Sequence, residues 1–231
     1  MKDQTLSQGI LKFYKEIGLD FQLPAHVSVL DPYGDPGVWK VVRSFYRKFY
    51  ADAGSRVILF GINPGRFGAG VTGVPFTDPI RLDQECGIAN GFQKRGELSS
   101  EFVYEVVNAW GGSEAFYSRF FISALSPLGF VSQGKNLNYY DDKVLQQAAG
   151  PYILKKVRHQ QQMLRAGEVC FCLGEGTNYK YFSRLNEREK IFREIIPLPH
   201  PRWVMQYRRK QKQQYIDLYV RKLSEVLEGN K

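Results

Sequence analysis

Four short runs of mostly apolar residues, separated by helical patterns, constrain the fold of this 231-residue chain most strongly. The runs lie at residues 56–62, 120–125, 168–173 and 195–198. Strands that are apolar at successive positions, rather than at alternate ones, are typical of a parallel sheet buried on both faces. Because helices alternate with these strands, the sequence predicts an α/β protein, a three-layer sandwich with a central, mainly parallel four-stranded sheet.

Helical periodicity accounts for much of the remaining chain. Apolar residues recur at helical spacing in four segments, at residues 4–17, 39–50, 99–110 and 206–227. A fifth helix, capped by Asp141 or Asp142, is expected to run toward Met163. Pro151 predicts a kink or a restart within it. No linker rich in Gly, Ser or Pro divides the chain, so we expect a single domain over residues 1–231.

Basic residues outnumber acidic ones, and the excess is concentrated. The chain holds 32 Lys and Arg against 23 Asp and Glu, which gives a formal net charge of +9. Such a balance fits a protein that binds polyanions, because each phosphate that it neutralises releases condensed counterions. One acid-free segment, residues 202–212, carries Arg202, Arg208, Arg209, Lys210 and Lys212. A solvated basic helix face explains this run equally well.

Cysteine content and hydropathy indicate the compartment. Three cysteines are too few for a disulfide framework and indicate a reducing environment. Cys170 and Cys172 lie in an apolar run, where core packing is expected, and no ligand spacing typical of a metal site is present. No apolar signal region and no run of membrane-spanning length occur. We therefore expect an intracellular protein without membrane contact, in the cytoplasm or nucleoid of a bacterium or the nucleus of a eukaryote.

Two unusual loops leave the carboxyl ends of predicted strands. One begins at Asn63 and extends to about Pro79, and the other is the Pro-His-Pro turn at residues 199–201. In open parallel sheets the active site lies outside the carboxyl ends of the strands. We therefore expect these two loops to meet on one rim of the sheet.

The first loop contains residues 68–73, which match the G-x-G-x-x-G pattern of dinucleotide-binding proteins literally. The context argues against that function, because Gly68 lies well past the strand and Val74-Pro75 stands where a helix should open. No Gly-Lys-Ser/Thr ending indicates a P-loop. A nucleotide cofactor is therefore not expected, and a structural Gly-rich turn is the remaining alternative.

The start of the same loop is similar to a known family. Residues 61–68 read Gly-Ile-Asn-Pro-Gly-Arg-Phe-Gly, and residues 72–76 read Thr-Gly-Val-Pro-Phe. This segment resembles motif 1 of the single-strand-selective monofunctional uracil-DNA glycosylases, a family of the uracil-DNA glycosylase superfamily. The motif is long and specific, so it is the strongest indication of function in the chain.

Further segments match the same family in the same order. The His-Pro pair at residues 200–201 resembles the start of a second motif, and residues 121–128 and 134–137 resemble two other stretches. The resemblance spans about residues 28–225. It implies a uracil-DNA glycosylase-like fold, with the N-terminal helix at about 4–17 as an extra element.

The resemblance implies a role for each matching position. Asn63 corresponds to the residue that positions the attacking water, and His200 to the residue that hydrogen-bonds the departing base. Phe76 corresponds to the aromatic residue that stacks on the flipped base. Gly65 corresponds to a small residue of the pocket wall, and the backbone at Ile62 is expected to face the base.

These residue types suit the implied chemistry. An amide cannot take a proton as a carboxylate does, so Asn63 is suited to holding a water rather than to acting as a general base. Catalysis then depends on stabilising negative charge on the departing base, for which His200 and backbone N–H groups are suitable donors. Structural alternatives stay open: Asn63 as a turn residue before a proline, His200 as a hydrogen-bonded structural histidine, and Phe76 as ordinary packing.

The chain departs from the family pattern in the segment that reads uracil. There the family has an Asn, whereas this chain has Ala124, which neither donates nor accepts a hydrogen bond through its side chain. Discrimination should then depend on backbone groups, Ser123 or Ser126. We therefore expect a divergent member with a broadened spectrum that includes hypoxanthine or xanthine alongside uracil.

A second departure follows the His-Pro pair, where the family has an Arg that helps to fill the gap left in the duplex. Arg202, Trp203 and Met205 are candidates for this wedge, and the sequence does not choose among them. DNA contacts are expected from the basic residues Arg66, Arg202, Arg208, Arg209 and Lys210.

The sequence therefore predicts a monomeric, monofunctional DNA glycosylase of base excision repair, which flips a deaminated base out of DNA and hydrolyses its N-glycosidic bond. No metal or organic cofactor is expected, and no motif places a Lys as a Schiff-base nucleophile. Two alternatives remain. One is a catalytically weak nucleic-acid-binding module of the same fold, and the other is an unrelated α/β hydrolase or nucleotide enzyme, whose usual fingerprints are missing.

Overall fold

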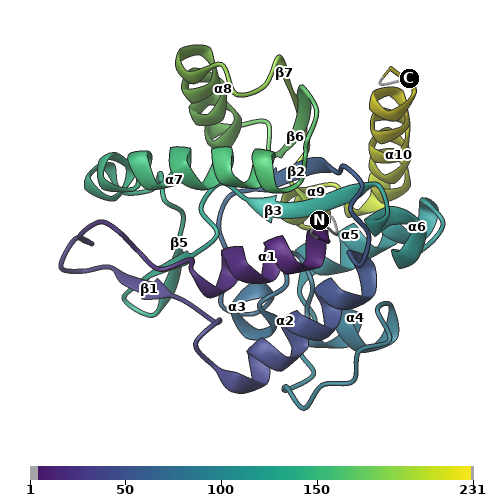
Figure 1. The fold of residues 1–231 in the computed structure, drawn as a ribbon, viewed down its shortest axis with the longest axis horizontal. Helices are drawn as coiled ribbons and strands as arrows, with labels where there is room; N and C mark the ends of the chain where they lie inside the picture. Colours follow the sequence, from purple (N-terminus) through teal and green to yellow (C-terminus); the bar gives the residue numbers. More distant parts are fainter. Residues whose placement is uncertain (1–4, 230–231) are drawn as a thin grey trace.

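The central sheet of the protein contains four parallel strands in the order β3-β2-β6-β7 (Figure 1). The structure is a computed structural model, and it describes residues 5–229. The strands are β2 (Val57–Gly61), β3 (Phe120–Ala124), β6 (Val169–Leu173) and β7 (Glu194–Leu198). The prediction of a mainly parallel four-stranded sheet is confirmed.

Helices cover both faces of this sheet. Phe60 in β2 packs edge-on against Phe182 of α8 (Thr177–Glu189), with the ring centroids 5.4 Å apart. Phe120 in β3, whose register places it on the opposite face, packs against Trp110. Every residue of β2, β3 and β6 is buried, which explains why these strands are apolar at successive positions.

The carboxyl ends of the strands lie along one edge of the sheet. Gly61 at the end of β2 pairs with Ala124 at the end of β3, and Leu173 of β6 pairs with Leu198 of β7. The loops that follow these residues therefore leave from one rim, as the order of strands and loops predicts.

The other helices of the described region are α1 (Leu6–Lys15), α2 (Pro36–Phe49), α3 (Ala69–Thr72), α4 (Pro79–Gln84), α5 (Leu98–Ala109), α6 (Ser113–Tyr117), α7 (Lys143–Met163), α9 (Pro201–Tyr207), the 3-10 helix η1 (Arg209–Gln211) and α10 (Lys212–Gly229). Polar side chains begin several of them. Thr5 forms a capping box at α1, and Asp35 and Asp142 accept backbone N–H groups at α2 and α7. Helix α1 falls within the expected range of 4–17, whose first residue lies outside the described region.

Two expectations about helices are corrected. Helix α7 continues through Pro151 without a restart, because the buried side chains of Tyr152 and Ile153 hold it against the core, and a kink at Pro151 stays a prediction. The single closing helix expected at 206–227 is instead α9, η1 and α10 in succession. Helix α9 begins early, because the His200 side chain caps it and a proline follows at its first position.

A second, small antiparallel sheet is not predicted by the sequence patterns. It has the order β1-β4-β5, and its strands are β1 (Ser28–Leu30), β4 (Gly129–Ser132) and β5 (Lys135–Leu137). Strands β1 and β5 contain three residues each and are largely exposed, so no apolar period marks them. The chain just beyond β5 nevertheless contacts the loop that follows β2.

The interior is rich in aromatic side chains, and the cysteines belong to it. Cys86, Cys170 and Cys172 are buried and carry free thiols, and core packing is the expectation from the sequence for Cys170 and Cys172. Across residues 5–229 the structure contains no helix that is both long and apolar enough to cross a membrane. In the same region no three His, Cys, Asp or Glu side chains are grouped so that they could hold a metal ion.

Candidate active site

A pocket of about 880 Å³ lies at the carboxyl edge of the central sheet, and both unusual loops contribute to it. The predicted site residues that line it are Ile62, Asn63, Gly65, Arg66, Phe76, Ser123, His200 and Arg202. Among the described residues, the predicted ones that lie outside this lining are Ser126, Arg208, Arg209 and Lys210. The two loops therefore meet on one rim, as the order of strands implies.

Backbone groups hold the Asn63 side chain just beyond the end of β2. Its Oδ1 accepts a hydrogen bond from the Tyr139 N–H at 3.1 Å. Its Nδ2 donates to the carbonyl oxygens of Leu137 at 3.2 Å and Pro64 at 3.3 Å. Because donor and acceptor each have a partner of the matching kind, the amide has one orientation, and Oδ1 keeps a second acceptor site for a water.

Phe76 has a backbone conformation that is rare for a residue with a Cβ atom, with φ at +53°. Its ring lies against Gly61, where an added Cβ would come within 2.7 Å of a ring carbon. The ring centroid is 6.1 Å from that of His200. The unusual backbone thus holds the aromatic ring over the end of β2 and beside the histidine.

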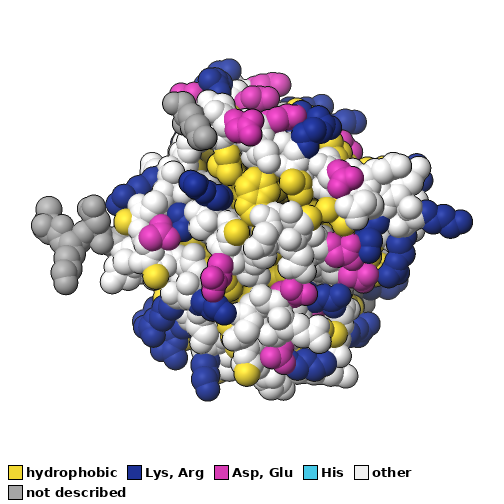
Figure 2. Space-filling view, turned by 90° about the vertical axis from the view of Figure 1, so that its right-hand side faces the viewer, with side chains coloured by type: hydrophobic (Ala, Val, Ile, Leu, Met, Phe, Trp, Pro, Cys, Tyr) yellow, Lys and Arg dark blue, Asp and Glu magenta, His cyan; other side chains and the backbone are white. Residues whose placement is uncertain are grey.

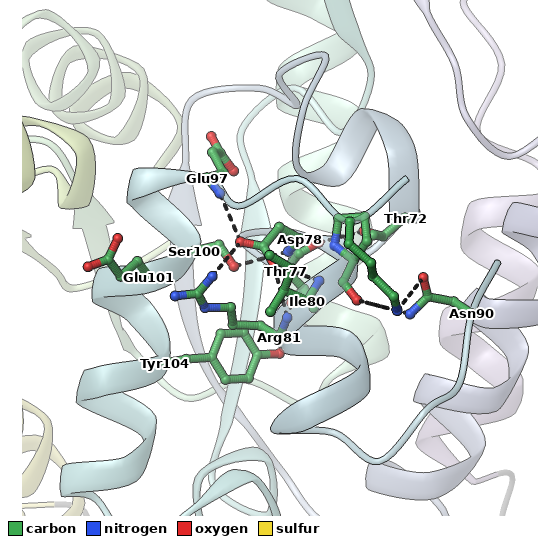
Figure 3. A network of polar contacts seen from close by, with 12 residues as sticks. Thr72, Thr77, Asp78, Ile80, Arg81, Asn90, Glu97, Ser100, Glu101 and Tyr104 are labelled. Carbon is green, nitrogen blue, oxygen red and sulfur yellow. Dashed lines mark hydrogen bonds and ion pairs between the residues drawn. The ribbon is translucent and has the colours of Figure 1, made fainter. Parts of the chain in front are cut away.

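A buried polar network holds the segment that carries Phe76 (Figure 3). Asp78 is fully buried and accepts hydrogen bonds from three backbone N–H groups at 2.9 Å each, including that of Glu97. The Thr77 and Tyr104 hydroxyls lie 2.9 Å apart in the same network. Moving Phe76 to an ordinary backbone conformation would disturb these bonds, and several of them involve a charged group and are correspondingly strong.

His200 is the N-cap residue of α9, and this contact defines its tautomer. The ring Nδ1 accepts a hydrogen bond from the Arg202 N–H at 3.1 Å, so the ring proton belongs on Nε2. Burial, and to a lesser extent the charge of Arg202, lowers the pKa of His200 to about 4. The imidazole is therefore neutral at physiological pH and keeps Nε2–H as a donor.

The wall at the end of β3 has no amide in the lining position of Ala124. The hydroxyl of the neighbouring Ser123 donates to Oε1 of the fully buried Gln160. Ser126 is also buried, and its hydroxyl donates to the Leu128 carbonyl at 2.7 Å. The hydroxyl protons of both predicted serines are therefore already used within the protein.

The predicted DNA-contacting residues have different surroundings. Arg66 and Arg202 line the pocket. Arg208 lies over the ring of Trp203, 5.1 Å from its centroid, and Arg209 pairs with an acidic residue of α5 at 3.1 Å. On the face that carries α6 and α10, basic and acidic side chains alternate rather than forming one basic surface (Figure 2). Within the basic run at residues 202–212, Arg202 thus lines the pocket, whereas Arg209 and Lys212 pair with acidic residues of α5.

Several aromatic residues of the pocket are missed by sequence reasoning. Phe67 and Tyr207 line it and are 37 % and 65 % exposed. Trp203, a wedge candidate from the sequence, also lines it and is 37 % exposed. Met205 is only 3 % exposed, which excludes it as the wedge. Tyr14 of α1 also lines the pocket, although its place in an amphipathic helical pattern predicts only core packing.

Comparisons with known proteins identify the class to which this fold and site belong. Residues 48–224 match the family model described as the uracil DNA glycosylase superfamily. The protein is therefore a DNA glycosylase, a hydrolase that acts on N-glycosyl bonds, and the chain belongs to the uracil-DNA glycosylase superfamily. The superfamily assignment suggested by motif 1 is confirmed.

One solved structure is similar over nearly the whole chain. It is the crystal structure of wild-type Pedobacter heparinus SMUG2, with a TM-score of 0.94 and 40% sequence identity. The match covers 97% of this chain and 99% of that chain. A comparison with curated protein sequences gave no match.

The contact between Gly61 and Phe76 leads to the first testable prediction. We expect Gly61→Ala to slow base release at least about tenfold, because the added methyl group must displace the Phe76 ring or the strand end. Single-turnover release of uracil from an oligonucleotide measures the effect. Gly167→Ala is the matched control, since a Cβ there meets nothing within 4 Å. Equal rates in both variants would contradict the proposed position of the ring.

The neutral state of His200 predicts a characteristic pH dependence. Since its pKa is lowered to about 4, we expect the rate of base release to show no titration near pH 6.5 and to fall only as the pH approaches 4. Below about pH 6.5, His200 is protonated in the unfolded chain but stays neutral in the folded chain, so protonation stabilises the unfolded state. The contribution of His200 to stability should therefore decrease as the pH falls from about 6.5 to about 4.

A pH–rate profile with urea unfolding at each pH checks both expectations. Glu97 lines the same pocket, and burial raises the pKa of its carboxyl group, so its titration must be separated from that of His200. Glu97→Gln removes that second titration and isolates the contribution of His200. A rate that halves near pH 6.5 in this variant would show that the histidine is not held neutral.

Proposed function

We propose that the protein flips a deaminated base out of DNA, stacks it on Phe76 and hydrolyses its N-glycosidic bond in base excision repair. Asn63 and the neutral His200 lie in one pocket beside Phe76, and backbone hydrogen bonds hold both polar side chains. This juxtaposition is the observation that supports the function. We further infer that the enzyme acts as a monomer inside the cell, in the nucleoid or cytoplasm of a bacterium or the nucleus of a eukaryote.

Asn63 holds the attacking water in this mechanism. Its Oδ1 already accepts the Tyr139 N–H, and the remaining lone pair accepts one hydrogen from the water. An amide is too weak a base to deprotonate that water in the ground state. The water therefore attacks the sugar only as the glycosidic bond breaks, when C1′ becomes strongly electrophilic. The oxygen bonds to C1′, its proton is lost to solvent, and the bonding electrons of the C–N bond leave with the base.

His200 stabilises the departing base. Negative charge grows on the base as the C–N bond breaks, and the Nε2–H group donates a hydrogen bond to a carbonyl oxygen that carries part of this charge. A neutral imidazole stabilises this charge by hydrogen bonding alone and does not protonate the base before the C–N bond breaks. The Arg202 N–H at Nδ1 keeps the proton on the other ring nitrogen, which is the one that the mechanism requires.

Phe76 helps to hold the base outside the helix. Flipping a nucleotide costs a few kcal/mol, and stacking on an aromatic ring returns about 1–3 kcal/mol. A ring that is already held over the end of β2 loses little further freedom when the base arrives. The backbone strain at Phe76 is consistent with such a functional constraint.

The pocket wall favours a broad substrate spectrum. Ala124 offers no hydrogen bond through its side chain, and the hydroxyl proton of Ser123 is used by Gln160. Without an amide at this point, the side chains at the end of β3 include none that both donates and accepts in the pattern of uracil alone. We therefore infer that hypoxanthine or xanthine is excised alongside uracil.

Aromatic and basic residues at the pocket suit a DNA surface. Phe67 contacts two arginines, Arg66 and Arg95, whose guanidinium carbons are 5.1 Å and 3.9 Å from its ring centroid. The exposed rings of Trp203 and Tyr207 also border the pocket. We infer that one of these two rings fills the gap in the duplex and that the arginines contact phosphates.

Replacing Asn63 tests this function. We expect Asn63→Ala to lower the single-turnover rate of base release by about 10²–10³, because the water loses its acceptor. Binding to DNA that contains a tetrahydrofuran abasic site should change little. Duplexes carrying uracil, hypoxanthine or xanthine, incubated with enzyme and then cleaved with alkali, report the rate and the spectrum together.

Asn108→Ala is a control for the loss of an amide, since Asn108 is exposed on α5 and its side chain hydrogen-bonds only Glu85 among the described residues. Its rates should match those of the wild type. Unchanged release by Asn63→Ala would contradict the role of Asn63. Binding of all three duplexes without release by the wild type would instead support a nucleic-acid-binding module of the same fold.

A further inference from the structure

Tyr14 of α1 occupies an unusual place in the pocket. Its side chain lines the pocket, yet the residue is only 1 % exposed, so it belongs to an enclosed part of the wall. The pocket also contains Ser123 and Ala124 at the end of β3. Helix α1 thus reaches the region where the wall has no amide.

The hydroxyl of Tyr14 has no hydrogen-bond partner among residues 5–229, and neither does that of Tyr46. Its polar neighbours are the hydroxyl groups of Tyr33, Tyr46 and Ser123. An unsatisfied buried hydroxyl is unfavourable for folding, so native proteins rarely keep one without a further role. A ligand in the pocket is the partner that would satisfy it.

We propose that Tyr14 is a specificity-determining residue whose hydroxyl donates a hydrogen bond to the exocyclic carbonyl of the flipped base. The inference rests on the proposed function. Ala124 cannot recognise the base through its side chain, and Tyr14, from another part of the chain, is assigned that role. Helix α1 lies before residues 48–224, the segment that matches the superfamily model. The recognition group therefore comes from outside the segment that defines the superfamily.

The chemistry of deamination explains why a donor is useful there. Deamination converts an exocyclic amino group into a carbonyl in uracil, hypoxanthine and xanthine alike. A hydroxyl donor meets an acceptor in each of these bases, whereas cytosine or adenine would present another donor at the same point. One donor thus accepts uracil and the larger hypoxanthine, and it disfavours their parent bases cytosine and adenine.

The surroundings keep the Tyr14 hydroxyl in the donating state. Burial raises the pKa of Tyr14, so the group stays protonated at physiological pH.

Tyr14→Phe removes only the hydroxyl and tests the inference. Tyr46→Phe is the matched control, because its hydroxyl is equally buried and unpartnered within residues 5–229 but the residue is not part of the pocket lining. Two duplex probes separate base recognition from DNA binding. One carries 2′-fluoro-2′-deoxyuridine, in which the fluorine slows glycosidic cleavage, and the other carries a tetrahydrofuran abasic site.

We expect Tyr14→Phe to weaken binding of the fluorinated uridine duplex about tenfold and to slow uracil and hypoxanthine release about tenfold. Its binding of the abasic duplex should stay within about twofold of the wild type, as should every value for Tyr46→Phe. The unfolding temperature of Tyr14→Phe should be unchanged or higher, since an unsatisfied buried hydroxyl is removed.

A loss that is equal on both probes, or absent from both, would overturn the role of Tyr14, and so would the same losses in Tyr46→Phe. The binding measurements do not depend on catalysis. If the wild type releases no base, the proposed function fails, but the comparison of the two probes still decides whether Tyr14 recognises the base.

Discussion

The hydrogen bonds between the Asn63 amide and the backbone at and just after the end of β5 join the two sheets of the protein at the candidate active site. Oδ1 accepts the Tyr139 N–H, and Nδ2 donates to the Leu137 carbonyl. Since the amide has a single orientation, its second acceptor site has a defined direction. The small sheet therefore supports the loop after β2. In the proposed mechanism this support positions the attacking water more accurately than a loop packed only against itself would.

The other functional side chains of the pocket, Phe76 and His200, lie near Asn63, and each is held by its own local contacts. Phe76 keeps a strained backbone because Gly61 leaves room for its ring and the Asp78 network holds the segment behind it. Strain of this kind costs about 1–3 kcal/mol and persists where the surroundings overdetermine the conformation. His200 is held by the start of α9, which also makes it a neutral donor. The geometry thus fits the proposed mechanism, in which the C–N bond to the base breaks before the water bonds to C1′.

The central sheet could be predicted from the sequence because its strands are buried and their residues are therefore apolar. Strands β2, β3 and β6 are covered on both faces, and such strands require apolar residues at every position. Asn63, Phe76 and His200 are found from the resemblance to a family, and the strand order alone predicts that their loops meet. Strands β1 and β5 are short and largely exposed, so their sequences show no periodic pattern of apolar residues. Tyr14 could not be predicted, because a helical pattern does not distinguish a core position from an enclosed pocket wall.

The most direct measurement is the identity of the products that the wild-type enzyme makes from a uracil-containing oligonucleotide. Mass spectrometry of a single-turnover reaction reports the released base and the mass of the strand before any alkali is added. The account predicts one free uracil per strand and an intact strand with an abasic sugar, because water is the nucleophile. A strand that is cut without alkali, or a strand that keeps its uracil, would contradict it.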